Sequence, residues 1–252
     1  MDDRSHSAPE SQASRRFADG HPRVKDHVVT VTGGTDLTPW YRRLTFDPAG
    51  LFEVYHPSPA SYLLLNLDDP GRGSPVQRSY SVCQVSPTSF ALEFVLHPGP
   101  GPASAWAAQA HPGSTLSVSE PAYHMRLPEL DYGLLIADAS AFAAISSLLV
   151  AIEPGIQLDL LLLDPHPDRE QISLPIRDNT TITWADCLDE DRLRGFTHGI
   201  DPAQVFLWGA GERQCAKAIR EFVRQEFPVP RTAQHIQTYW IAPDPVRVSG
   251  EN

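Results

Sequence analysis

The pattern of hydrophobic residues changes once along this chain, near residues 126–131, and that change constrains the fold more than any other feature. Before it, apolar runs are short and are separated by Gly, Pro and Asp. Within 90–97, apolar residues recur at every second position from Phe90 to Leu96, as in a half-buried strand. Further strands are expected at 24–31, 42–46, 62–67 and 76–82. Five or six such strands without long helices predict an antiparallel β-barrel over residues 23–127.

After the change, strand-like and helix-like segments alternate. The run 158–163 is continuously apolar, as in strands that are buried on both faces of a sheet. Apolar residues recur at helical spacing from Phe142 to Ile152 and from Cys215 to Val223. Shorter apolar runs that predict strands lie at 132–137, 180–184 and 205–208. This alternation predicts a parallel sheet in a Rossmann-like α/β domain, residues 128–243.

Charge and cysteine content disfavour several classes of function. The chain has 252 residues, and its 31 acidic and 20 basic side chains give a formal net charge of −11, which disfavours binding to nucleic acid. Its three cysteines are far apart, so they predict neither a disulfide framework nor a metal site, and they favour a reducing compartment. No apolar run approaches the roughly 20 residues of a membrane span. We therefore expect a cytoplasmic protein that acts on a small molecule, with a disordered tail at 1–22 and a second tail at 244–252.

The first candidate motif is Arg78-Ser79-Tyr80-Ser81. Side chains alternate along a strand, so Arg78 and Tyr80 point to the same face. A guanidinium can bind a diphosphate with two hydrogen bonds, and a phenol ring can lie against a flavin. The Ser81 hydroxyl could reach a flavin ring nitrogen. The alternative is an ordinary exposed strand with a surface arginine.

The second motif is the glycine- and proline-rich turn that leads from His97 into a predicted helix at 103–110. The free N–H groups of a helix amino end attract anions, and Ser104 adds a hydroxyl there. A turn followed by a capped helix is the alternative.

The third and fourth motifs end two strands of the second domain. The strand 205–208 runs into Gly209-Ala210-Gly211-Glu212, which predicts a turn that opens a helix at the ligand-binding edge of a parallel sheet. Asp138 and Ser140 follow the strand 132–137, and both are good helix-start residues. The alternatives are a tight turn and simple helix caps. The acidic group 189–191 is expected in a solvated turn, and the single histidines His97, His124 and His235 are expected to be structural.

Taken in order, these motifs resemble the siderophore-interacting protein family of flavoreductases, which are relatives of ferredoxin-NADP reductase. Residues 78–81 resemble its flavin signature, RxY followed by Thr or Ser. The other similar segments are 38–46, 97–106, 112–121, 138–144, 208–212 and Tyr239-Trp240, so the resemblance covers residues 24–242.

The resemblance implies that NADPH or NADH passes a hydride to FAD, and that the flavin passes single electrons to a ferric siderophore, releasing Fe(II). It implies that Tyr80 stacks on the isoalloxazine and that Ser81 faces its reactive edge, as the catalytic residues. The residues implied to bind the FAD diphosphate are Arg78, His97, Gly101, Ala103 and Ser104. Those implied to frame the nicotinamide cofactor are Asp138, Ser140, Gly209, Ala210, Gly211 and Glu212.

The chain departs from the family pattern in three places. Cys83 stands where the family has a second arginine, and losing such a phosphate contact is expected to cost about 1.5–3 kcal/mol. Ala139 and Ala143 replace a glutamate and a proline of the nicotinamide loop. Residues 241–243 replace a basic ending that is expected to help hold an anionic ferric siderophore. Two alternatives therefore stay open. One is a repurposed flavoreductase fold that catalyses a non-redox step, such as a cyclisation, in small-molecule biosynthesis, and the other is a non-catalytic binding protein.

Overall fold

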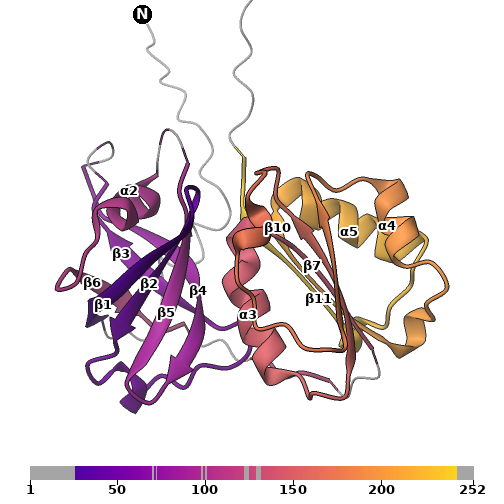
Figure 1. The fold of residues 1–252 in the computed structure, drawn as a ribbon, viewed down its shortest axis with the longest axis horizontal. Helices are drawn as coiled ribbons and strands as arrows, with labels where there is room; N and C mark the ends of the chain where they lie inside the picture. Colours follow the sequence, from indigo (N-terminus) through magenta and orange to yellow (C-terminus); the bar gives the residue numbers. More distant parts are fainter. Residues whose placement is uncertain are drawn as a thin grey trace, which may run out of the picture.

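A computed structural model describes residues 26–242 except 70, 72, 98, 100, 122–124 and 129–131. The tails expected at 1–22 and 244–252, and His124, lie outside the described residues. The described part forms a closed barrel followed by a parallel sheet with helices (Figure 1), which confirms the expected two-part architecture.

The barrel is closed by six antiparallel strands in the order β1-β2-β5-β4-β3-β6. These are β1 (Asp26–Thr38), β2 (Tyr41–Asp47), β3 (Tyr62–Leu67), β4 (Val76–Ser86), β5 (Ser89–Val95) and β6 (Thr115–Ser119). The alternating residues of β5 fill the interior, where Phe90, Leu92 and Phe94 are fully buried. The short helix α2 (Pro102–Gln109) packs against β2, β3 and β5 and covers one end of the barrel (Figure 1). The 3₁₀ turn η1 (Leu51–Glu53) follows β2.

The second part is a five-stranded parallel sheet in the order β11-β10-β7-β8-β9. Its strands are β7 (Tyr132–Asp138), β8 (Gln157–Leu163), β9 (Thr180–Ala185), β10 (Val205–Glu212) and β11 (Gln234–Trp240). Its helices are α3 (Phe142–Ala151), α4 (Glu190–Phe196) and α5 (Arg213–Gln225), with 3₁₀ turns η2 (Ala139–Ala141), η3 (Arg169–Gln171), η4 (Pro202–Gln204) and η5 (Arg231–Ala233). Helix α3 lies between the barrel and the sheet, while α4 and α5 lie on the far face (Figure 1). None of the described helices is long and apolar enough to cross a lipid bilayer.

Two expectations about local structure were wrong. Residues 209–212 do not form a turn but continue strand β10, because β11 pairs with them; Gly209, for example, lies opposite Ile236. The acidic group 189–191 is not a solvated turn but the start of α4, where the Asp189 carboxylate accepts a hydrogen bond from the Arg192 N–H. A helix with few apolar residues gives little periodicity, so the sequence did not reveal α4.

The two parts pack directly against each other through buried residues. Cys83 on β4 is fully buried and packs against Ala91 and Ala143, the latter on α3. Beside it, the buried Glu93 carboxylate accepts hydrogen bonds from Tyr41 Oη and Arg43 Nε, each at 2.7 Å. Burial, reinforced by the Glu93 charge, raises the pKa of the Cys83 thiol well above its usual value. The thiol therefore stays protonated, and the position serves packing between the domains.

Candidate functional site

Strand β4 presents the predicted flavin residues at the edge of the domain interface. The Tyr80 ring lies 4.6 Å from the ring of Phe94, centroid to centroid, and burial raises the pKa of Tyr80 to about 12. The phenol therefore stays neutral and is held in place by packing. Arg78, two residues earlier, is exposed, and its guanidinium donates to the Gln77 carbonyl at 2.8 Å.

Helix α2 and Tyr80 share one aromatic neighbour on β5. The Phe94 ring lies 4.6 Å from the Tyr80 ring and 6.0 Å from the Trp106 ring of α2, centroid to centroid. The N-cap residue Gly101 is extended and provides no side-chain cap, so the N–H groups of the first turn, including Ala103 and Ser104, remain for another acceptor. His97 is exposed in the segment that leads to this turn.

Open space surrounds this helix end. A Cβ added at Gly99 or at Gly101 would meet nothing within 4 Å, and Gly99 adopts a left-handed φ of +69°. The α2 end thus offers N–H groups without a side-chain cap and open space, and Arg78 adds an exposed cation two residues before Tyr80. These are the features that a dinucleotide diphosphate requires.

The part of the site expected to hold the flavin ring is covered by Tyr239 of the second domain. The Ser81 hydroxyl is buried and donates a hydrogen bond to Tyr239 Oη at 3.2 Å. Tyr239, near the end of β11, also meets the buried Trp208 edge-on, with ring centroids 6.3 Å apart. Tyr239 therefore lies where the sequence places the reactive edge of a flavin beside Ser81.

The hydrogen-bond donors of this site fit FAD, provided that the hydrogen bond between Ser81 and Tyr239 opens. Arg78 and the α2 amino end can hold the diphosphate, and Tyr80 and Ser81 offer a ring surface and a hydroxyl. A flavin ring can reach the Ser81 hydroxyl only if Tyr239 gives up its hydrogen bond, which is worth about 1 kcal/mol. That cost is small compared with the binding energy of a dinucleotide.

The residues implied for the nicotinamide cofactor do converge, but their carboxylates are already engaged. Asp138 Oδ1 accepts from the Ser140 N–H at 2.9 Å and from Ser140 Oγ at 2.5 Å. Asp138 Oδ2 accepts from the Glu212 N–H at 2.7 Å and from Trp240 Nε1 at 2.8 Å. This carboxylate therefore joins the carboxyl ends of β7, β10 and β11.

Glu212 is engaged in the same way. Its carboxylate accepts from the Gln214 N–H at the start of α5 and from the Ala242 N–H at 3.2 Å. Gly211 is required here, because a Cβ would lie only 2.6 Å from Asp138 Oδ2. Gly209 and Ala210 are buried within β10, and a Cβ on Gly209 would lie 3.2 Å from Ile219.

The structure adds Tyr239 and Trp240 to the candidate site. In the sequence this pair is indicated only by the resemblance, which implies no role for it. Their adjacency on one strand was the available signal, because neighbouring side chains on a strand point to opposite faces. One reaches Ser81 in the barrel and the other reaches Asp138 in the sheet.

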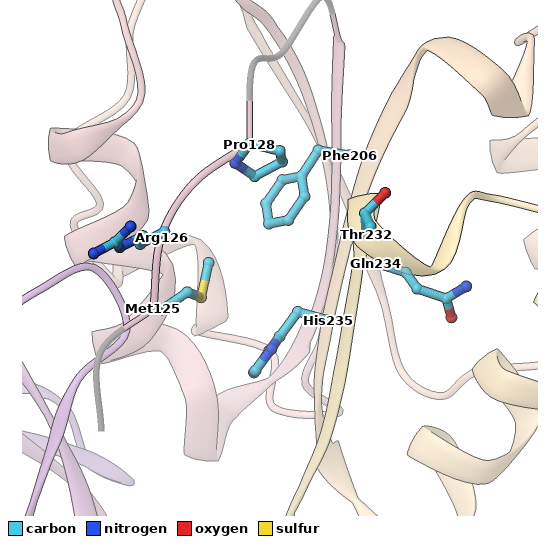
Figure 2. Close-up of a pocket in the computed structure, with 7 residues that line it drawn as sticks. All are labelled: Met125, Arg126, Pro128, Phe206, Thr232, Gln234 and His235. Atoms are coloured by element: carbon cyan, nitrogen blue, oxygen red, sulfur yellow. The ribbon is translucent and has the colours of Figure 1, made fainter. Parts of the chain in front are cut away.

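A separate cavity of about 340 Å³ lies at the opposite, amino-terminal edge of β10 and β11 (Figure 2). Its lining residues are Met125, Arg126, Pro128, Phe206, Thr232, Gln234 and His235. Figure 2 shows the side chains of Met125, Phe206 and His235 pointing into a shared space, while Arg126 points away from it. The cavity is therefore poor in charge and lies at the far end of these strands from Asp138.

Two family models match the two halves of this architecture. Residues 66–125 match the siderophore-interacting FAD-binding domain, and residues 130–242 match the siderophore-interacting protein model. The chain belongs to the siderophore-interacting protein family. Its barrel is thus an FAD-binding domain, in agreement with the donor set on β4 and α2.

Similar proteins include both transporters and reductases. The mycobactin import ATP-binding/permease protein IrtA of Mycolicibacterium smegmatis is 31% identical over 86% of this chain, which spans only 26% of that relative. The chain thus spans about a quarter of the length of this curated relative. The ferric acinetobactin reductase of Acinetobacter baumannii is 25% identical over 73% of this chain and 67% of its own length.

Solved structures show the same fold. The siderophore-interacting protein SipS from Aeromonas hydrophila superposes with a TM-score of 0.75 at 23% identity, covering 87% of this chain and 93% of its own. A ferredoxin NADP+ reductase from Neisseria gonorrhoeae, solved with bound FAD and NADP, gives a TM-score of 0.65 at 14% identity, covering 86% of this chain and 100% of its own. The expected reductase-type fold is confirmed.

Proposed function

We propose that this protein is an FAD-containing NAD(P)H oxidoreductase that reduces a ferric siderophore and releases Fe(II). The observation that carries the proposal is the set of Arg78, Tyr80 and Ser81 on β4 together with α2, whose amino end has no side-chain cap. The two elements are linked by Phe94, whose ring contacts both Tyr80 and Trp106 of α2. Membership of the siderophore-interacting protein family and the similarity to a ferric acinetobactin reductase support the choice of substrate.

The chain's own residues bind and orient the reactants. Arg78 and the N–H groups at the start of α2 would neutralise the FAD diphosphate. The neutral Tyr80 ring, fixed against Phe94, would support the flavin ring, and Ser81 would hold its edge through a hydroxyl. Bound FAD supplies the ability to accept two electrons at once and to release them singly.

The electron balance fixes the stoichiometry. One NAD(P)H gives up a hydride, so two ferric ions are reduced to Fe(II) and one proton is released. Cys83 would serve packing between the two domains, because it is buried against Ala143. Reduced iron is expected to leave because Fe(II) is a weaker partner than Fe(III) for the hard oxygen ligands of siderophores.

The test is anaerobic reduction by the FAD-loaded protein. NADH and NADPH are added in turn, and loss of the oxidised flavin absorbance is followed. A ferric hydroxamate and a ferric catecholate siderophore are then supplied with a chromogenic Fe(II) chelator. We expect bleaching of the flavin, its re-oxidation by the ferric complex, and two chelated Fe(II) per NAD(P)H.

The binding residues have a matched control. Arg78→Ala should weaken FAD binding tenfold to a hundredfold, the equivalent of about 1.5–3 kcal/mol for a charge-assisted contact. Gln77→Ala, the neighbouring residue on the opposite face of β4, should leave the affinity unchanged. FAD that binds but resists both nicotinamides, or equal effects of the two variants, would contradict the proposal.

A further inference from the structure

We infer that the nucleotide site of this protein selects NADH over NADPH. The inference rests on the proposed function and names its electron donor. Its basis is the charge at the carboxyl ends of β8 and β9, where carboxylates gather and the nearby arginines are already paired.

The sheet order sets where each end of the dinucleotide lies. Ligands of open parallel sheets lie across the carboxyl ends of the strands. The nicotinamide must approach the flavin strand, which meets the sheet at Tyr239 on β11. The adenosine end then extends the other way, past β7 toward β8 and β9, which lie one and two strand spacings of about 4.8 Å beyond β7.

That end of the sheet is strongly acidic. Asp164 follows β8 and is buried, with Oδ1 accepting from the His166 N–H at 2.9 Å and lying 2.5 Å from His166 Nδ1. Asp186 follows β9, and its side chain is 74% exposed. Asp189 caps α4, whose first turn carries Glu190 and Asp191. A 2′-phosphate would bring up to about two further negative charges into this group of carboxylates.

The arginines that could receive a 2′-phosphate are committed to these carboxylates. Arg169 donates to Asp186 Oδ1 at 2.5 Å and to the Asp164 carbonyl, and its guanidinium carbon lies 5.9 Å from the centre of the Trp184 ring. Arg194 pairs with Glu190 and Asp191 on α4, at 2.9 and 3.0 Å. Among the described arginines at these strand ends, each has a carboxylate within 4 Å, and the loosest pair is that of Arg192, whose Nε lies 3.8 Å from Asp189 Oδ2.

Other cations lie elsewhere. Lys217 faces Glu221 along α5 at 3.8 Å. Arg213 begins α5 after β10, and in the sheet order both β7 and β8 separate β10 from β9. Arg213 therefore suits the diphosphate that NADH and NADPH share and does not discriminate between them.

The same acidic group favours the ribose of NADH. Carboxylates at this edge of a dinucleotide fold accept hydrogen bonds from the ribose hydroxyls, whereas an arginine accommodates the 2′-phosphate of NADPH. The Arg169 ion pair uses Oδ1 of Asp186, and Oδ2 would accept from a ribose hydroxyl. Asp186 is thus the residue that determines the specificity.

Binding and turnover are measured separately. Isothermal titration of the FAD-loaded protein with NAD+ and NADP+, and with AMP and 2′-phospho-AMP, reports selectivity without any reaction. We expect each 2′-phosphorylated ligand to bind at least tenfold more weakly than its partner. The ratio of kcat/KM for NADH to that for NADPH should exceed ten.

One substitution should invert the preference. Asp186→Ser removes a carboxylate and releases Arg169, which Trp184 still supports, so NADP+ affinity should rise at least tenfold while NAD+ affinity falls. Asp178→Ser removes the same charge at the opposite end of β9, where Asp178 is exposed, and should leave both affinities unchanged.

The outcomes separate this inference from the proposed function. Selective binding of NAD+ without flavin reduction would overturn the reductase but support the selectivity. Flavin reduction with equal or better use of NADPH would support the reductase and overturn the selectivity, as would an unchanged NAD+/NADP+ affinity ratio in Asp186→Ser.

Discussion

The indole Nε1 of Trp240 donates a hydrogen bond to Oδ2 of Asp138 at 2.8 Å, across 102 residues of sequence. Three further donors, two from Ser140 and one from the Glu212 backbone, complete the acceptor capacity of this carboxylate. The contact fixes the end of β11 to the carboxyl ends of β7 and β10. Asp138 is therefore a structural junction at the edge where a nicotinamide cofactor is proposed to bind.

Asp138→Asn should destabilise the protein by about 3 kcal/mol. An amide nitrogen cannot accept hydrogen bonds. In either orientation of the new amide, its NH2 group therefore faces two of the four donors, which lose their acceptor. Urea unfolding followed by circular dichroism measures the loss. Ser140→Ala, which removes one of the four donors, should cost about 1 kcal/mol. A loss as small in Asp138→Asn as in Ser140→Ala would refute the junction.

Tyr239→Phe should strengthen FAD binding. The variant keeps the ring but removes the hydroxyl that accepts a hydrogen bond from Ser81 at 3.2 Å. The flavin edge then no longer competes with Tyr239 for the Ser81 hydroxyl. A hydrogen bond of about 0.5–1.5 kcal/mol corresponds to a gain of roughly twofold to tenfold in affinity. Quenching of flavin fluorescence gives the dissociation constant. Tyr132→Phe, which loses a hydroxyl bonded to Asp159 at the start of β7, is the control and should bind FAD as the parent does.

Cys83→Arg should not restore the arginine of the family signature as a phosphate contact. The Cys83 side chain is fully buried between Ala91 and Ala143, so a guanidinium there would overpack the domain interface and bury a charge. We expect a loss of about 3 kcal/mol or more in unfolding free energy and no gain in FAD affinity. Cys83→Ala should cost about 1 kcal/mol. A stable Cys83→Arg protein with tighter FAD binding would show that the side chain reaches the cofactor.

The buried Tyr55 should make stability fall at alkaline pH. Tyr55 is 4% exposed, and burial raises its pKa from 10.0 to about 12. The unfolded chain therefore loses this proton first, so the stabilisation is complete below pH 10 and is lost as the pH rises toward 12, at about 1.4 kcal/mol per pH unit. Urea unfolding across this interval measures the slope. Tyr55→Phe should lower the slope by that amount, and equal slopes in the two proteins would disprove the assignment.

The sequence by itself determined most of the elements, α4 being an exception. The apolar run 158–163 indicated a strand covered on both faces, and β8 occupies it. The alternation from Phe90 to Leu96 indicated a strand with one buried face, and that face of β5 fills the barrel. The other face is buried as well, because Ala91 packs against Ala143 of the second domain, which the alternation did not indicate. Periodicity and turn residues are local signals, so they suffice to identify the fold class. The flavin motif on β4 is a local signal too, because its four residues, 78–81, are contiguous in the sequence.

Only the tertiary structure decided which side chains meet. Ser81 and Tyr239 are separated by 158 residues, and their contact depends on how the two domains pack. Cys83 lies two residues beyond the flavin motif, yet it faces α3 because the domain interface covers that side of β4. Periodicity reports whether a side chain is buried but not what covers it, because the partner comes from a distant strand or helix whose position is set by packing.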